Sequence, residues 1–136
     1  MKVLLDINVV MDVLLDRPHL STASAAVMAR VEVKKMAGVL CATSITTIHY
    51  LASKAQGKAV ARQTLQLLLQ QYEIAPVNQD ILMQAHTSGF RDYEDGVQYA
   101  AACSVGSQVI ITRNTKDFTL SDLPVVTPEE FIVHYS

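Results

Sequence analysis

Short apolar runs alternate with longer amphipathic segments along this chain, and this alternation limits the fold more than any other feature. The runs have the length of buried strands, and they are Val3–Leu5, Val39–Ala42, Glu73–Val77, Val109–Ile111 and Val125–Val126. Strands that are separated by helices need crossover connections, which favour a parallel sheet. We therefore expect an α/β protein, with a three-layer α/β/α sandwich around a central, mainly parallel sheet, as a single domain over residues 1–136.

The segments between the runs carry apolar residues at helical spacing, and most begin at good capping residues. Helices are expected at about 7–15, 21–36, 45–54, 58–72, 79–87, 92–105 and 128–135. Ser21 is expected to cap the second helix. Thr127, Pro128 and Glu130 have the spacing of a cap, a first-turn proline and a capping-box partner. Residues 112–118 are expected to form a loop.

Composition excludes several classes of protein. Half of the 136 residues are hydrophobic and the net charge is −2, so a core is possible but a general attraction to nucleic acid is not expected. No apolar run approaches the roughly 20 residues that span a bilayer, and Asp6 interrupts the N-terminal run too early for a signal peptide. Cys41 and Cys103 lie in apolar stretches and are expected to be buried free thiols. A cytoplasmic protein that does not associate with membranes is the expectation.

Acidic residues follow strands or begin helices at three places. They are Asp6 after the first strand, Asp92, Glu94 and Asp95 at the start of a helix, and Asp117 after the fourth strand. Parallel strands end at one edge of a sheet, where ligands bind in such folds, and the helix before the fourth strand begins at that edge. We therefore expect Asp6, Asp95 and Asp117 to converge.

A cluster of this kind requires a proton or a cation. Two carboxylates about 4 Å apart repel each other by roughly 4 kcal/mol at an effective dielectric constant near 20. Carboxylate oxygens are hard ligands that suit Mg²⁺ or Mn²⁺, and a divalent ion there can activate water for hydrolysis.

Each acid also has a structural explanation when it is taken alone. Asp6 or Asn8 can cap the first helix, Asp92 can cap the helix that it opens, and Glu94 suits the positive end of that helix. Asp117 suits a turn. Their joint position at one expected sheet edge favours a site over separate structural roles.

Three motifs resemble those of the PIN-domain family, which includes the VapC-like toxin ribonucleases. They lie, in the family's order, at Asp6–Asp12, which contains an Asp-x-Asn sequence, at Asp92–Ala101 and at Ile110–Phe118. Val126–Phe131 resembles the start of the family's last helix. The resemblance spans the chain. It implies a PIN-like fold and a metal-dependent endoribonuclease that hydrolyses RNA phosphodiester bonds, often as the toxin of a toxin–antitoxin pair.

The resemblance also implies roles for individual residues and partners. Mg²⁺ or Mn²⁺ would be held by Asp6, Asp95 and Asp117, with Glu94 and Asp92 as further carboxylates. Support for the ligands or contact with substrate would come from Asn8, Thr112, Asn114, Arg113 and Lys116, of which Arg113 and Lys116 could equally be solvated loop charges. RNA as substrate, a small antitoxin protein and a homodimer are the implied partners.

One departure from the family concerns the helix after the second strand, where a second acid, most often Glu, is usual. Residues 33–72 contain neither Asp nor Glu. The corresponding position falls on Thr46, Thr47 or His49. His49 could be a metal ligand or a proton carrier, or it could simply pack among the apolar residues of its helix.

The missing acid leaves several functions open. Glu94 or Asp92 could supply the carboxylate from the neighbouring helix start, which would preserve a nuclease. Alternatively the chain is a PIN-like scaffold with weak or no catalysis that binds RNA or a protein partner. A third hypothesis is phosphoryl transfer through Asp6, as in dehalogenase-type phosphatases, but that chemistry requires a second Asp where Asn8 stands.

Overall fold

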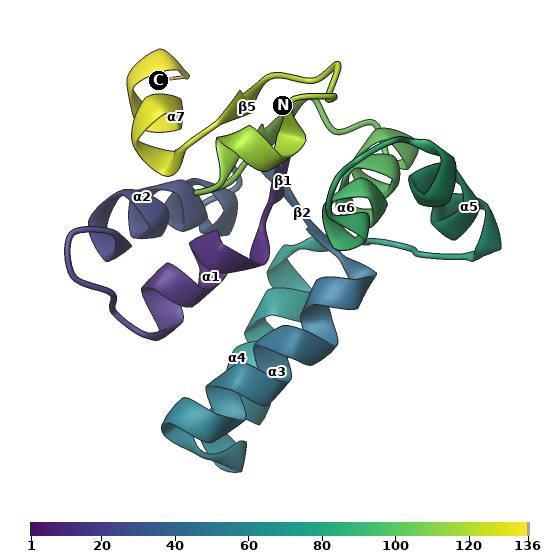
Figure 1. Cartoon of the computed structure of the whole chain (residues 1–136). Coiled ribbons are helices and arrows are strands. Elements are labelled where there is room, and N and C mark those ends of the chain that lie inside the picture. Colours follow the sequence, from purple (N-terminus) through teal and green to yellow (C-terminus); the bar gives the residue numbers. More distant parts are fainter. Residues whose placement is uncertain (136) are drawn as a thin grey trace.

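Five short strands form one parallel sheet in the computed structural model, which describes residues 1–135 (Figure 1). Their order is β3-β2-β1-β4-β5, with every neighbouring pair parallel. The strands are β1 Lys2–Leu5, β2 Ala37–Cys41, β3 Glu73–Ala75, β4 Val109–Ile111 and β5 Val125–Val126. The expected parallel sheet is confirmed, and β1 lies at its centre, paired on one side with β2 and on the other with β4.

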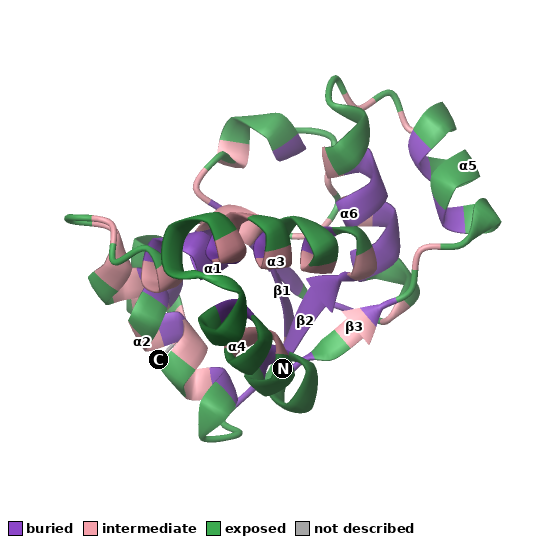
Figure 2. Cartoon of the chain, turned by 90° about the horizontal axis from the view of Figure 1, so that it is seen from below, coloured by how far each residue is buried: buried purple, intermediate pink, exposed green. Residues whose placement is uncertain are grey.

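Helices cover both faces of the sheet and form the outer layers. They are α1 Ile7–Leu14, α2 Ser21–Glu32, α3 Ala42–Gln56, α4 Lys58–Gln71, α5 Gln79–Thr87, α6 Tyr93–Ser104 and α7 Pro128–His134, with a 3₁₀ helix, η1, at Thr115–Phe118. Side chains alternate across a strand, so Val3 and Leu5 join the core under α1, α2 and α7, whereas Leu4 joins the core under α5 and α6. Figure 2 shows β1 and β2 buried between these layers.

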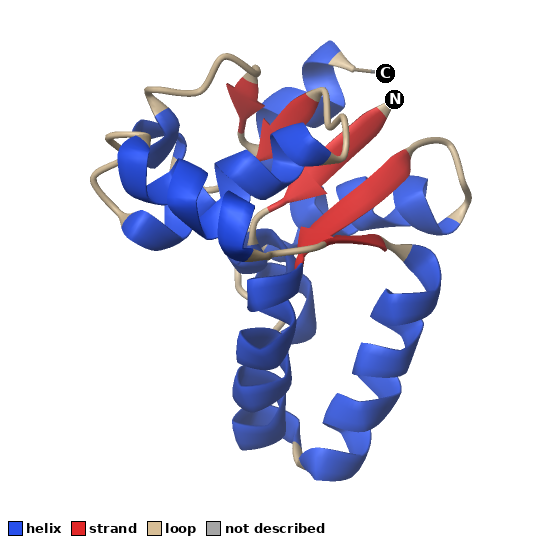
Figure 3. Cartoon of the chain, turned by 90° about the vertical axis from the view of Figure 1, so that its right-hand side faces the viewer, coloured by secondary structure: helices blue, strands red, loops and turns tan. Residues whose placement is uncertain are grey.

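Two features fix how the helices lie on the sheet. Ala100, Ala101 and Ala102 let α6 approach one face closely, since small side chains allow helix and strand backbones to come together. In Figure 3, α3 and α4 lie side by side and extend away from the sheet. They are joined at Gly57, whose φ of +90° favours glycine.

The structure corrects several expected boundaries. The second helix ends at Glu32 rather than Met36, because the chain turns through Lys34, at a φ of +63°, to begin β2 at Ala37. The third helix is longer than expected, β3 stops before Pro76, and part of the expected loop 112–118 is the helix η1.

Two expected side-chain roles were also wrong. Ser21 does not cap α2: Leu20 holds the cap position without a side-chain bond, and the Ser21 hydroxyl donates to Asp16. Cys103 is exposed, whereas Cys41 is buried as expected; both are free thiols. The capping box of Thr127 and Glu130 at the start of α7 is confirmed. Within residues 1–135, no helix is both long and apolar enough to cross a membrane.

Candidate functional site

Asp6 lies where β1 passes into α1, and the backbone fixes its position. Its N–H donates to the carbonyl of Ile111 at the end of β4, at 2.9 Å. The residue is extended and forms the cap of α1. It is 4% exposed, so the carboxylate stands in the interior at the edge where β1 and β4 both end.

Four donors hold the Asp6 carboxylate. Oδ1 accepts from the N–H of Ile7 at 2.7 Å and from Nε2 of Gln98 at 3.1 Å. Oδ2 accepts from the Thr112 hydroxyl at 2.7 Å and from Nδ2 of Asn8 at 3.3 Å. The donors come from α1, α6 and the end of β4, so the orientation of this carboxylate is set before any ligand arrives.

Asn8 and Thr112 also order the loop that follows β4. The carbonyl oxygen of the Asn8 side chain accepts from the N–H of Arg113 at 3.3 Å. The Thr112 hydroxyl accepts from the N–H of Asn114 at 3.0 Å while it donates to Asp6. Asn8 and Thr112 therefore link Asp6 to the loop after β4, whereas Asn114 is exposed.

Asp95 lies in the first turn of α6, after the cap Asp92, whose Oδ1 accepts from the N–H of Glu94 at 2.9 Å. Burial raises the pKa of Asp95 to about 7, and the negative charges of Asp92, Asp6, Asp117 and Glu94 contribute to the rise. The structure thus brings the carboxylates of α1, α6 and η1 within electrostatic reach of one another. We call Asp6, Asp92, Glu94, Asp95 and Asp117 the acidic cluster.

The acidic cluster fits a divalent cation in donor type and in charge. Its oxygens are hard ligands, and burial followed by the charges of the neighbouring acids raises the pKa of Asp95. Gln98, which donates to Asp6, has a buried Oε1 atom without a hydrogen-bond partner. Among residues 1–135, however, no three His, Cys, Asp or Glu side chains are placed closely enough to form a ready set of metal ligands.

Arg113 was expected either to contact phosphate or to be solvated, but its guanidinium makes its hydrogen bonds within the protein. Its Nε donates to Oδ2 of Asp12 at 2.8 Å, and its terminal nitrogens donate to Glu129, to Ser24 and to the carbonyl of Leu20. Burial lowers the pKa of Arg113, but the bonds to Glu129 and Asp12 outweigh this and raise it above its ordinary value. The guanidinium is therefore engaged inside the protein.

Asp12 is fully buried and belongs to the same group. Its Oδ1 accepts from Arg17 at 3.2 Å, and its Oδ2 accepts from the Ser24 hydroxyl at 2.8 Å as well as from Arg113. We call Asp12, Arg17, Ser24, Arg113 and Glu129 the arginine network. Sequence reasoning missed Asp12, although a carboxylate in a helix as apolar as α1 could have indicated a buried ion pair.

The polar residues of α3, the helix that lacks the usual acid, differ in how far they are buried. Thr46 and Thr47 are not buried, and neither is His49. Ser44, earlier on α3, is buried and its hydroxyl has no partner. Lys116 is exposed on η1, which leaves it available to solvent.

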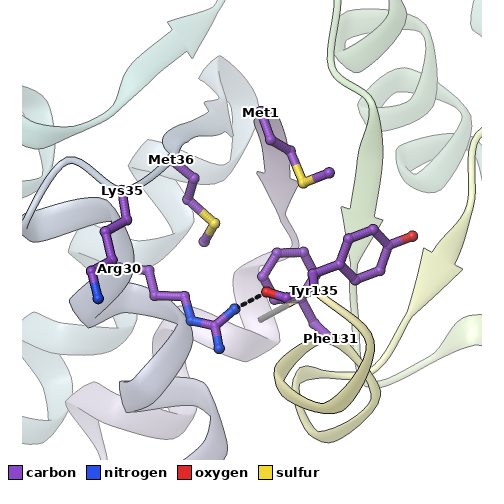
Figure 4. A pocket seen from close by; sticks show the side chains of 6 residues that line it. All are labelled: Met1, Arg30, Lys35, Met36, Phe131 and Tyr135. Carbon is purple, nitrogen blue, oxygen red and sulfur yellow. Dashed lines mark hydrogen bonds between the residues drawn. The ribbon is translucent and has the colours of Figure 1, made fainter.

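A cavity of about 610 Å³ lies at the other edge of the sheet, where β1 and β2 begin. Figure 4 shows its lining residues, Met1, Arg30, Lys35, Met36, Phe131 and Tyr135. Arg30 already donates to the Tyr135 carbonyl and lies over the Phe131 ring. Because the cavity lies at the opposite edge of the sheet, it is separate from the acidic cluster.

Comparison with known proteins gives one family and several similar folds. A family model described as "PIN domain" matches residues 2–116. The curated protein "Ribonuclease VapC1" of Aquifex aeolicus (strain VF5) is 30% identical over 135 residues, which cover 96% of this chain and 92% of that protein.

Two solved structures show the same arrangement of helices and strands. A toxin–antitoxin complex from Klebsiella pneumoniae has a chain that matches with a TM-score of 0.70 and 23% identity, covering 93% of this chain and 97% of that one. DNA-bound VapBC from Salmonella typhimurium matches with a TM-score of 0.69 and 14% identity, covering 94% and 98%. The expected fold class is thereby confirmed.

Proposed function

This chain belongs to the PIN domain family, and from that membership we propose that it is a metal-dependent endoribonuclease that hydrolyses RNA phosphodiester bonds. The observation that carries the proposal is the immobilised Asp6 carboxylate beside Asp95, whose pKa is raised to about 7 by burial and by the surrounding acids. The name of the Aquifex aeolicus relative, a ribonuclease, supports the substrate class.

In this proposal Asp6, Asp95 and Asp117 hold Mg²⁺ or Mn²⁺, and Glu94 and Asp92 add negative charge at the rim. The ion supplies a site that activates water and neutralises charge on the phosphate. Thr112 and Asn8 keep Asp6 oriented through the bonds already described. Asn114 and Lys116, both exposed on the loop after β4, are available to contact the RNA backbone.

We further propose that the protein is the toxin of a toxin–antitoxin pair. Similar folds occur in a toxin–antitoxin complex and in a DNA-bound VapBC complex, which supports a small antitoxin protein as partner. A homodimer and a cytoplasmic location belong to the same proposal. The two free thiols, Cys41 and Cys103, fit a reducing compartment.

A second candidate function is a PIN-like scaffold that binds RNA or a protein without cleaving RNA. Two observations favour it: α3 carries no acid, and no three potential ligand side chains within residues 1–135 are grouped for a metal. His49 is the residue on α3 that could replace the acid, although it is only half-buried. The two candidates differ in whether metal produces cleavage.

The deciding experiment measures cleavage of a mixed RNA substrate with Mn²⁺, with Mg²⁺ and with chelator. Asp6→Asn and Asp95→Asn remove one charge each while they keep the side-chain size. Asp80→Asn is the matched control, because Asp80 is an exposed acid in the first turn of α5. We expect cleavage that requires the metal, that both site variants lose and that the control retains.

Other outcomes separate the candidates. Cleavage that persists in both site variants would indicate a contaminating nuclease. Absence of cleavage by folded protein across several RNAs and both metals would contradict the nuclease and favour the scaffold. RNA binding by the same preparations, measured by fluorescence anisotropy, would then test that second candidate.

A further inference from the structure

Gln98 lies on α6, one turn after Asp95, and is 1% exposed. Its Nε2 donates to Oδ1 of Asp6 at 3.1 Å. An ionised carboxylate can only accept hydrogen bonds, so chemistry requires the amide nitrogen to face Asp6 and the amide oxygen to face elsewhere. The bond to Asp6 therefore identifies which of the two polar atoms of Gln98 is the nitrogen.

The amide oxygen has no partner in the protein. Oε1 of Gln98 is buried and accepts no hydrogen bond. Buried acceptors without partners are uncommon, and they usually face an ordered water or an ion. The neighbouring residues of α6, Val97 and Ala101, pack in the apolar core, so packing alone would be satisfied by an apolar side chain at this position. The bond to Asp6 accounts for the amide nitrogen, but the amide oxygen remains without a partner.

We propose that Gln98 is a positioning residue of the acidic cluster, whose Oε1 accepts a hydrogen bond from a water molecule bound to the divalent cation. The proposal rests on the metal dependence in the proposed function. Within residues 1–135 no three potential ligand side chains are grouped, which counts against a closed set of protein ligands, so the cation in this proposal keeps water among its ligands. Mg²⁺ in such sites usually keeps several waters, which need acceptors around them.

The amide also suits a site without an acid on α3. A further carboxylate beside Asp6 would add to the negative charge that already raises the pKa of Asp95. A neutral amide provides an oxygen without this charge, and its nitrogen holds Asp6 at the same time. In this proposal Gln98 supplies an oxygen from α6, whereas α3 offers no carboxylate.

The test measures the affinity for Mn²⁺ by isothermal titration calorimetry on the metal-free full chain, for wild type and Gln98→Met. Methionine has a similar volume but offers no strong acceptor. We expect Mn²⁺ affinity to fall by ~10-fold or more, as is typical when a residue that supports metal ligands is lost. Ser107→Ala is the matched control, because its buried hydroxyl is also unpartnered but precedes β4 at the opposite edge of the sheet.

Each outcome has a defined meaning. Unchanged Mn²⁺ affinity in folded Gln98→Met, with binding intact in wild type, would overturn the role of Gln98 and leave the nuclease proposal standing. Absence of Mn²⁺ binding by wild type would overturn both. Reduced affinity in Gln98→Met with unchanged affinity in Ser107→Ala would support a positioning role, and retained affinity in Gln98→Glu, which lacks the donor to Asp6 but keeps an oxygen, would assign that role to Oε1.

A second variant keeps the proposal testable if Gln98→Met does not fold. Gln98→Glu retains an oxygen at the same distance from the backbone and adds a charge that attracts the cation. We expect Gln98→Glu to bind Mn²⁺ at least as tightly as wild type. Weaker binding by this variant would contradict an acceptor role for Oε1.

Discussion

Two groups of acidic side chains lie near the junction between β1 and α1, and they differ in how their charge is balanced. In the arginine network, the buried Asp12 accepts from Arg17, Ser24 and Arg113. In the acidic cluster, the donors around Asp6 are neutral, and no salt bridge within residues 1–135 involves a member of the cluster. The same residue type is neutralised in one group and left uncompensated in the other.

This difference distinguishes the arginine network, a structural group of paired charges, from the acidic cluster, a candidate site for a ligand. The arginine network joins α1, α2, α7 and the loop after β4, and it does so with paired charges that need no ligand. In the acidic cluster, burial and then the neighbouring acids raise the pKa of Asp95 to about 7, and perturbed pKa values of this kind are found preferentially at functional sites. Removing a charge from the arginine network should therefore destabilise the protein, whereas removing a charge from the metal-free acidic cluster should stabilise it.

Removing the positive charge from the arginine network should have the largest effect. Arg113→Met leaves the Asp12 carboxylate buried with less compensation, which typically costs about 3–5 kcal/mol of the free energy of unfolding. Urea unfolding followed by circular dichroism measures the loss. The matched control Arg62→Met removes an exposed arginine of α4 and should change stability by less than about 0.5 kcal/mol.

The double variant D12N/R113M sharpens this prediction. The asparagine that replaces Asp12 would be neutral, so the uncompensated charge disappears and part of the stability should return. A loss in Arg113→Met as small as that in Arg62→Met would show that the network carries little energy.

Adding a divalent cation should stabilise the protein through the acidic cluster and leave the arginine network untouched. Binding to the folded state alone stabilises by ~2.7 kcal/mol when the free ion is at about 100 times its Kd. Differential scanning fluorimetry with Mn²⁺ and with Mg²⁺ measures the rise in Tm. The rise should vanish in Asp95→Asn and persist in Asp80→Asn, so an equal rise in both would place the ion elsewhere.

The comparison also shows what the sequence could predict. Short apolar runs are local patterns, so the parallel sheet followed from them. An acid at a strand end and acids at a helix start are also local patterns, and they led to the prediction of a site at Asp6 and Asp95. The roles of Gln98 and Arg113 could not follow, because their partners lie 92 and 101 residues away and depend on how α6 and α1 pack on the sheet. An arginine in an expected loop was interpreted as solvated or bound to phosphate, and only the fold shows Asp12 beneath it.

Helix boundaries failed for a related reason. The sequence 33–36 has apolar residues that could continue α2, but the chain must leave the helix to reach the register of β2, in which Ala37 lies opposite Lys2. The turn through Lys34 at positive φ satisfies that geometric demand against the local preference. Tertiary constraints decided both the boundary and the side-chain partners.

The acidic cluster should make stability depend on pH in a way that the arginine network does not. The pKa of Asp95 is raised to about 7 from an ordinary value of 3.8, first by burial and then by the neighbouring acids. The folded state therefore holds this proton more tightly than the unfolded state. The resulting stability is fully present below about pH 3.8 and is lost as pH rises toward 7, by ~1–2 kcal/mol after allowance for solvent screening of a half-buried group.

Asp95→Asn tests this dependence by removing the titrating group. In metal-free buffer at about pH 8 the variant should be more stable than wild type by ~1–2 kcal/mol, and the difference should shrink toward about pH 4. Urea unfolding across this range measures it, with Asp80→Asn as control. A variant that is less stable than wild type at the alkaline end would mean that the charge of Asp95 is already compensated.

The smallest effect is expected at the exposed end of the arginine network. Glu129 pairs with Arg113, but its side chain is 49% exposed, unlike that of Asp12. Glu129→Gln should therefore cost only ~0.5 kcal/mol, as for other solvent-exposed ion pairs. The cost should disappear at about 1 M salt, where the Debye length falls to about 3 Å, whereas the cost of Arg113→Met should persist because Asp12 is shielded from solvent. Urea unfolding of both variants at about 0.1 M and about 1 M NaCl measures the contrast, and equal salt sensitivity in the two would show that the Asp12 pair is accessible to ions.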